Sequence, residues 1–76
     1  MNPKLKKQQE KFIKAVKHEM IDKDLNAERL RSLAKISVKT WYNYARMKTP
    51  ISIYNLFAIS DAVGLGVSFE FYNFES

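Results

Sequence analysis

Apolar residues recur along the chain at the spacing of amphipathic helices, and a capping residue stands before each run. The first run predicts a helix from residue 3 to about residue 21. Asn2 can cap its N-terminus, and Pro3 suits the first helical position, where the N–H has no helical partner. The other faces of this segment are rich in lysine, so the apolar side should pack on later helices. That apolar stripe comprises Leu5, Phe12, Ile13, Val16 and Met20.

Residues 26–47 contain two shorter helical patterns separated by a tight turn. Asn26 is suited to cap the first pattern, and Leu25 and Leu30 have the spacing of a hydrophobic staple around that cap. Leu30, Leu33 and Ala34 share one face by their three- and four-residue spacing, which predicts a buried side for this helix.

The second pattern covers residues 37–47, and the hydroxyl of Ser37 can cap it. About two or three residues, Lys35 and Ile36 among them, separate the two patterns, and so short a link forces a sharp angle between the helices. The segment therefore predicts a helix-turn-helix unit. The inward face of its second helix comprises Trp41, Tyr44 and Ala45.

A further helix is expected after Pro50, which ends the preceding helical region. Ser52 can cap this helix, while Gly64 and Gly66 suit its C-terminal stop. The spacing of the apolar residues predicts one buried stripe along it. The stripe comprises Ile53, Leu56, Ile59 and Val63.

The C-terminal segment, residues 67–76, has two interpretations that the sequence leaves open. Alternation of apolar and polar residues favours a short β-strand, whereas Ser68 can cap a short fifth helix. The segment also holds more large aromatic side chains than a short tail exposes without a reason. They either fold back on the core or form the contact of a homodimer. These residues are Phe69, Phe71, Tyr72 and Phe74.

The segment LNAERLRSLAKISVKTWYNYARMKTP, residues 25–50, resembles the helix-turn-helix of the lambda-repressor/Cro family. A looser likeness continues to about Ser68. Arg31 and Lys35 depart from the family pattern, which usually has a small alanine and a left-handed glycine at these positions. The resemblance implies one mostly all-α domain over residues 1–76, with four or five helices. The matching positions are Leu25, Glu28, Leu30, Ser37, Thr40, Arg46 and Pro50.

The resemblance implies a function as well: sequence-specific binding of double-stranded operator DNA by a transcription regulator of the phage repressor or Cro type. The helix over residues 37–47 would lie in the major groove. There Lys39 can donate to guanine, Asn43 can pair with adenine, and Val38 can touch a thymine methyl group. The resemblance assigns base edges to Val38, Lys39, Thr40 and Asn43. The phosphate candidates are Ser37, Tyr42, Arg46, Lys48, Ser52 and Asn55.

The distribution of charge agrees with this expectation. Residues 27–50 carry six Lys or Arg against one acid, a net +5, whereas residues 51–76 carry three acids and no Lys or Arg, a net −3. A basic patch attracts the phosphate backbone and supplies affinity that does not depend on base sequence. Charge that served solubility alone would not need to be segregated in this way.

Neither a catalytic nor a metal-binding constellation is visible. The chain has no cysteine, and its single histidine, His18, lies in the lysine-rich first helix. We therefore expect no enzyme, no cofactor and no metal. The apolar stretch over residues 53–67 is interrupted by Ser60, Asp61 and two glycines, so we expect no membrane span. The resemblance to phage-type regulators implies a place in the bacterial cytoplasm, at the nucleoid.

A protein-interaction module is the competing hypothesis. A helix-turn-helix scaffold can bind another regulator instead of DNA, as an antirepressor does, and fold alone does not decide between these functions. The acidic C-terminal third and the aromatic tail leave room for such a partner. Salt-sensitive binding to random duplex would favour DNA, whereas salt-insensitive pairing with a protein would favour this alternative.

Overall fold

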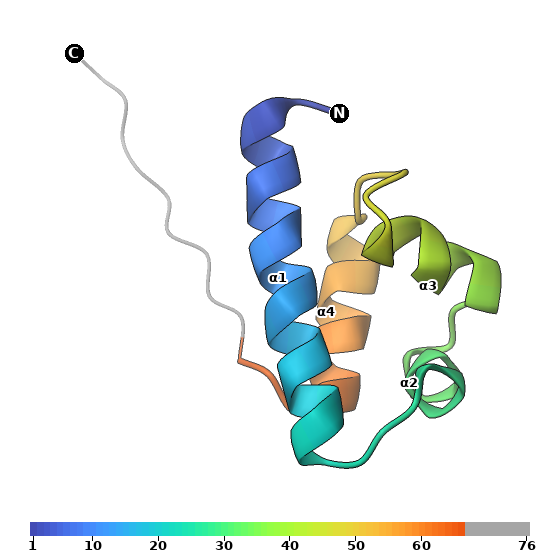
Figure 1. Ribbon diagram of the computed structural model, residues 1–76. Coiled ribbons are helices and arrows are strands. Elements are labelled where there is room, and N and C mark those ends of the chain that lie inside the picture. Colours follow the sequence, from blue (N-terminus) through green and yellow to red (C-terminus); the bar gives the residue numbers. More distant parts are fainter. Residues whose placement is uncertain (67–76) are drawn as a thin grey trace.

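The computed structural model describes residues 1–66, which form four α-helices and, within that range, no β-strand (Figure 1). The expected all-α fold is confirmed. The questions of a C-terminal strand or fifth helix, and of dimer contacts through Phe69, Phe71, Tyr72 and Phe74, lie outside the described residues. The helices are α1 (Pro3–Asp22), α2 (Ala27–Ala34), α3 (Val38–Ala45) and α4 (Ile53–Val63).

Each helix begins directly after the cap residue that the sequence predicted. In every case the side-chain oxygen accepts a hydrogen bond from a backbone N–H of the first turn, which satisfies a donor that the helix itself leaves without a partner. The four bonds join Asn2 to Lys4 N (2.8 Å), Asn26 to Arg29 N (2.7 Å), Ser37 to Thr40 N (3.0 Å) and Ser52 to Asn55 N (3.1 Å).

The helix ends are set by backbone conformation. Lys35 closes α2 at φ 58°, in the left-handed region where the resembling family has glycine. Gly64 closes α4 at φ 72°. The helix α3 is shorter than predicted: it ends at Ala45, and Met47, which was expected inside it, is itself left-handed at φ 59°. A left-handed residue cannot continue a right-handed helix, which explains the earlier end.

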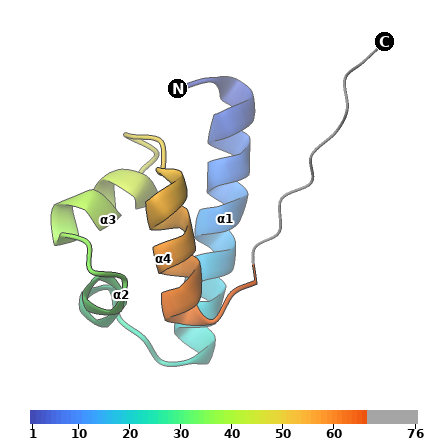
Figure 2. The ribbon, with the colours of Figure 1, turned by 180° about the vertical axis from the view of Figure 1, so that it is seen from behind.

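The core lies where the four helices meet. The helix α4 packs against α2 and α1, and α3 packs against α2 and α1. Figures 1 and 2 both show α1 and α4 side by side, with α3 displaced to one side of this pair. Each buried Leu or Val contributes roughly 1.5–3 kcal/mol. The core residues are Ile13, Val16, Leu30, Ala34, Ile36, Trp41, Tyr44, Ile59 and Val63.

Three leucine and isoleucine positions that the sequence assigned to buried stripes are instead exposed. The exposed fractions are 59% for Leu5, 43% for Leu33 and 68% for Ile53. Each lies in the first or last turns of its helix. Periodicity identifies the inward face of a helix, but it does not show how far the neighbouring helices extend, so end positions on that face can stay open. Leu5 lies at the rim of a pocket of about 300 Å³ that also borders on Phe12, Ile51 and Leu56.

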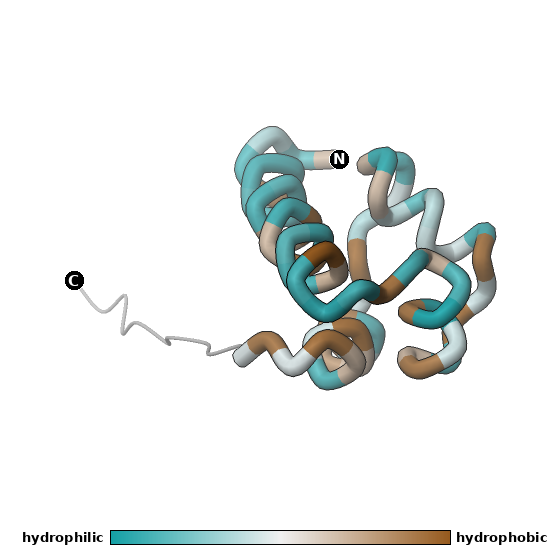
Figure 3. Tube along the Cα trace, turned by 60° about the horizontal axis from the view of Figure 1, so that its bottom comes forward, coloured by the Kyte–Doolittle hydropathy of each residue, from teal (hydrophilic) through white to brown (hydrophobic). Residues whose placement is uncertain are grey.

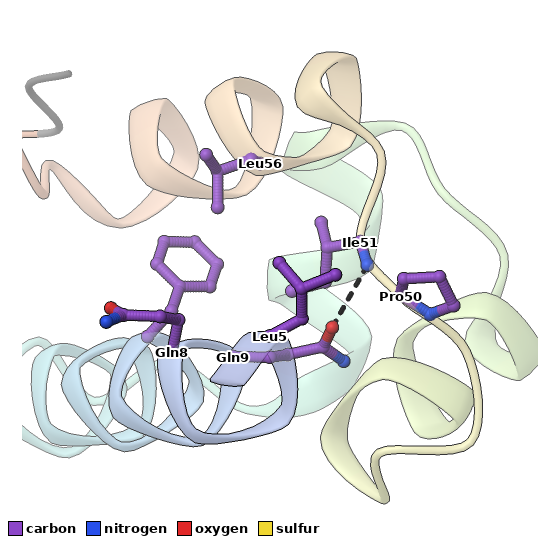
Figure 4. A pocket seen from close by; sticks show the side chains of 7 residues that line it. Leu5, Gln8, Gln9, Pro50, Ile51 and Leu56 are labelled. Atoms are coloured by element: carbon purple, nitrogen blue, oxygen red, sulfur yellow. Dashed lines mark hydrogen bonds between the residues drawn. The ribbon is translucent and has the colours of Figure 1, made fainter. Parts of the chain in front are cut away.

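The buried side of α1 includes a polar residue, Gln9, which is 7% exposed. Its Nε2 donates to the carbonyl oxygens of Tyr44 (3.1 Å) and Thr49 (2.9 Å). Its Oε1 accepts from the N–H of Ile51 at 3.1 Å, the bond drawn in Figure 4. One side chain of α1 thus holds both the C-terminal end of α3 and the connection from α3 to α4.

The C-terminal ends of α1 and α4 are joined by Lys23. Its ammonium donates to the carbonyl oxygen of Val63 and lies 3.4 Å from a carboxylate oxygen of Glu19. A cation at this place is also stabilised by the negative end of the α4 dipole.

Figure 3 shows that the outward side of α1 is hydrophilic over most of its length. In residues 1–66, none of the helices has the length and the apolar character that crossing a membrane requires.

Candidate nucleic-acid interface

The helix α3 has one face in the core and one face in solvent. Trp41 and Tyr44 are buried at 3% and 6% exposure, as the sequence predicted. On the other side, Val38 (39% exposed) and Tyr42 (43%) are open, as are Lys39 and Arg46. We call the four residues Val38, Lys39, Tyr42 and Arg46 the open stripe of α3. Their spacing places them along one line of the helix, which runs from its first residue to its C-cap.

The predicted base-reading residues are not equally accessible. Val38 and Lys39 belong to the open stripe, whereas Thr40 and Asn43 are half-buried at its edge. The hydroxyls of Thr40 and Ser37 lie 2.8 Å apart and form a hydrogen bond with each other. Both hydroxyls are therefore already used in closing the first turn of α3, where the oxygen of Ser37 also accepts from Thr40 N.

Tyr42, predicted as a phosphate contact, is exposed on α3. It lies in the middle of the open stripe, one helical turn from Val38 and one from Arg46. The Arg46 guanidinium lies over the Tyr42 ring, 5.3 Å from its centroid, in a cation–π contact. The spacing of residues 38, 42 and 46 was a signal for this arrangement, because Trp41 and Tyr44 had already fixed the inward face.

The basic residues on and after α3 have no acidic partner within the part of the chain that the structure describes. The ion pairs there are Lys23–Glu19 in α1 and Arg31–Glu28 in α2. Lys39, Arg46 and Lys48 are exposed and take part in neither. Their charge is therefore available to an external anion.

The start of α4 has a different character. Ser52 is exposed and caps the helix, so its oxygen already accepts from the N–H of Asn55. The Asn55 amide is half-buried and donates to the hydroxyl of Tyr44 at 2.6 Å. One of its hydrogens is therefore engaged within the chain, and the bond fixes α4 against α3.

Arg31, which stands where the resembling family has a small residue, forms an ion pair with Glu28 along α2. The hydrogen bond from Arg31, assisted by its charge, lowers the pKa of the Glu28 carboxyl, and the same bond raises the pKa of Arg31. The guanidinium is therefore held along α2, and the pair neutralises the charge of this residue.

Comparison with known proteins gives no relative: no family model, no curated protein and no solved structure matches the chain. Within residues 1–66, no three His, Cys, Asp or Glu side chains come together in a group that could hold a metal ion. Function is therefore inferred from the surface of α3, which has an open stripe, and from the cations on and after this helix, which have no acidic partner within residues 1–66.

Proposed function

We propose that this protein is a sequence-specific double-stranded DNA-binding transcription regulator, of the phage repressor or Cro type, which places α3 in the major groove. The observation that supports this proposal best is the open stripe of α3. It combines an aliphatic group, an ammonium, a phenol and a guanidinium on a helix that follows a sharp turn and is anchored by two buried aromatic residues.

Base recognition falls to the first two turns of α3. The Lys39 ammonium donates to guanine O6 or N7, and Val38 contacts a thymine methyl group. Asn43, at the edge of the stripe, pairs with adenine through its amide, with Thr40 beside it. The accessible fraction of Asn43 is smaller than that of Lys39, so we expect Lys39 to contribute more to discrimination.

Phosphate contacts surround this helix. Arg46 and Lys48 follow its C-terminal end, and Ser37 and Ser52 stand at the N-termini of α3 and α4, where backbone N–H groups favour anions. Tyr42 and Asn55 complete the proposed set. We further propose a homodimer on a two-fold operator, acting in the bacterial cytoplasm at the nucleoid, because paired half-sites match paired recognition helices.

A selection from a random duplex pool, read at two salt concentrations, tests the proposal. We expect enrichment of a common sequence, and binding of unselected duplex that weakens steeply as salt rises. Lys39→Ala should reduce enrichment of the selected sequence more than it reduces binding to random duplex. Salt-independent retention, or no retention of duplex at all, would contradict the proposal.

A second candidate, a protein-interaction module of antirepressor type, is favoured by one specific observation. The first two turns of α4 expose Ile53 (68%), Tyr54 (80%) and Phe57 (46%), an apolar surface outside the core. Such a surface is typical of protein contacts. This candidate predicts that Tyr54→Ser weakens pairing with a partner regulator and that Lys39→Ala does not.

A further inference from the structure

A shallow groove of about 260 Å³ separates α1 from the C-terminal end of α3. Lys14 and Lys17 line it from α1, and Arg46 lines it from the C-cap of α3. Its apolar lining includes Ile13, Ala45 and Met47, and its one acidic residue is Glu10. Residues distant in sequence thus place three cations around one depression.

These three cations are not neutralised within residues 1–66. Neither of the two ion pairs there includes Lys14, Lys17 or Arg46, and Glu10 forms no ion pair with Lys14 although the two are one helical turn apart. Lys14 and Lys17 are themselves neighbours on α1, and like charges at this spacing destabilise a helix slightly. An anion in the groove would relieve that repulsion.

The groove continues the open stripe of α3, because Arg46 belongs to both. It is open to solvent and has charged groups on two walls, which suits an extended, negatively charged strand better than an enclosed small anion. A duplex with α3 in its major groove brings a sugar–phosphate strand past the end of that helix.

We propose that the groove between α1 and α3 receives a sugar–phosphate strand of duplex DNA, with Lys14 and Lys17 contacting phosphates beyond the one at Arg46. This inference rests on the proposed function and extends it, since it adds α1 to the DNA-binding surface. The contacts are with phosphates, so they raise affinity for every duplex and carry no base preference.

The test compares two double variants of α1 on random-sequence duplex by fluorescence anisotropy between 50 and 200 mM salt. Each phosphate contact contributes about 0.9 to the slope of log K against log salt, so K14A/K17A should reduce the slope by about 1.8. The matched control is K4A/K11A, which removes two exposed lysines of the same helix that do not line the groove. It should change the slope by less than about half of one contact.

The outcomes separate this inference from the function on which it rests. If the unaltered protein binds duplex with a salt-dependent slope and the two double variants behave alike, the groove is not a phosphate site while the DNA-binding function stands. If the unaltered protein does not bind duplex, both proposals fail. Thermal unfolding followed by circular dichroism should show that both variants are folded, with midpoints that differ only slightly, since all four lysines are exposed.

Glu10→Gln tests the same proposal through a change that should strengthen DNA binding instead of weakening it. Removing the one carboxylate of the groove should strengthen binding to random duplex roughly two- to fivefold at low salt, the range expected for one exposed charge interaction. Asp22→Asn removes an exposed carboxylate of the same helix that lies outside the groove and in neither ion pair, so it should have a smaller effect. Equal effects of the two changes would indicate that overall charge, rather than the groove, is responsible.

Discussion

Lys35 shows how one residue determines the angle between two helices. Its left-handed backbone lets α2 end and α3 begin within a few residues. The turn is closed by the N–H of Lys35, which donates to Ser32 O at 3.3 Å, and by the N–H of Ile36, which donates to Arg31 O at 3.0 Å. A residue with a Cβ pays about 1–2 kcal/mol for this conformation, which glycine would largely avoid.

Lys35→Gly should therefore increase the free energy of unfolding. We expect a gain of up to about 1 kcal/mol, because relief of the left-handed strain exceeds the larger entropy that glycine has in the unfolded chain. Urea denaturation measures it. The control is Lys35→Ala, which removes the same charge and keeps the strain, and should give no gain. An equal gain in both variants would attribute the effect to charge.

Asn43 and Arg46 are expected to act in different ways on DNA. Asn43→Ala should weaken binding to the selected sequence by about 1–3 kcal/mol and relax the preference at one or two base pairs. Arg46→Ala should weaken binding to all sequences and reduce the salt slope by about 0.9. Titration of each variant with selected and random duplexes checks this. If both variants lose affinity equally on the two duplexes, the assignment of roles is wrong.

At the scale of elements, Gln9 connects α1 to the segment between α3 and α4. The three hydrogen bonds of its side chain reach residues 44, 49 and 51, which lie on both sides of Arg46 and Lys48. The path of this connection therefore depends on a helix that is distant in sequence. The side-chain amide of Gln9 therefore positions both Lys48 and the N-terminus of α4.

Gln9→Met should destabilise the fold by about 2 kcal/mol, because a side chain of similar size removes the hydrogen bonds and leaves buried backbone groups without them. The amide of Ile51 should then exchange its hydrogen faster than in the unaltered protein, which is measured by NMR. The adjacent Gln8 is exposed, so Gln8→Met should leave both quantities nearly unchanged. Unchanged exchange at Ile51 in Gln9→Met would show that the connection does not depend on Gln9.

The order and the first residues of the helices were predictable because their signals are local, whereas the C-terminal end of α3 was placed too late. Asn2, Asn26, Ser37 and Ser52 cap helices through atoms a few residues away, and the apolar spacing identified most of the core. The role of Gln9 was missed although it keeps helical register with Ile13 and Val16, because its partners are more than thirty residues away. Leu5 and Ile53 were misassigned for the corresponding reason: their burial depends on where other helices end.

At the scale of the whole molecule, the sequence indicated which segments carry an excess of positive charge, but not which cations from different helices lie close together. The excess of Lys and Arg over residues 27–50 can be counted directly. That Lys14 and Lys17 lie across a groove from Arg46 follows only from the packing of α1 on α3. The candidate interface was thus predictable on α3, where helical spacing separates open from buried residues, and unpredictable on α1.

The link between Lys23 and the last carbonyl of α4 has a chemical consequence. Its nitrogen is held by Val63 O and Glu19 Oε2, so an amine-reactive ester should acylate it more slowly than the solvated Lys11 of the same helix. In urea the two rates should converge. Pulse labelling followed by peptide mass spectrometry measures both, and equal rates under native conditions would contradict the link. If Lys23 is acylated slowly, its acylation rate can be used to measure whether the C-terminal ends of α1 and α4 remain packed together.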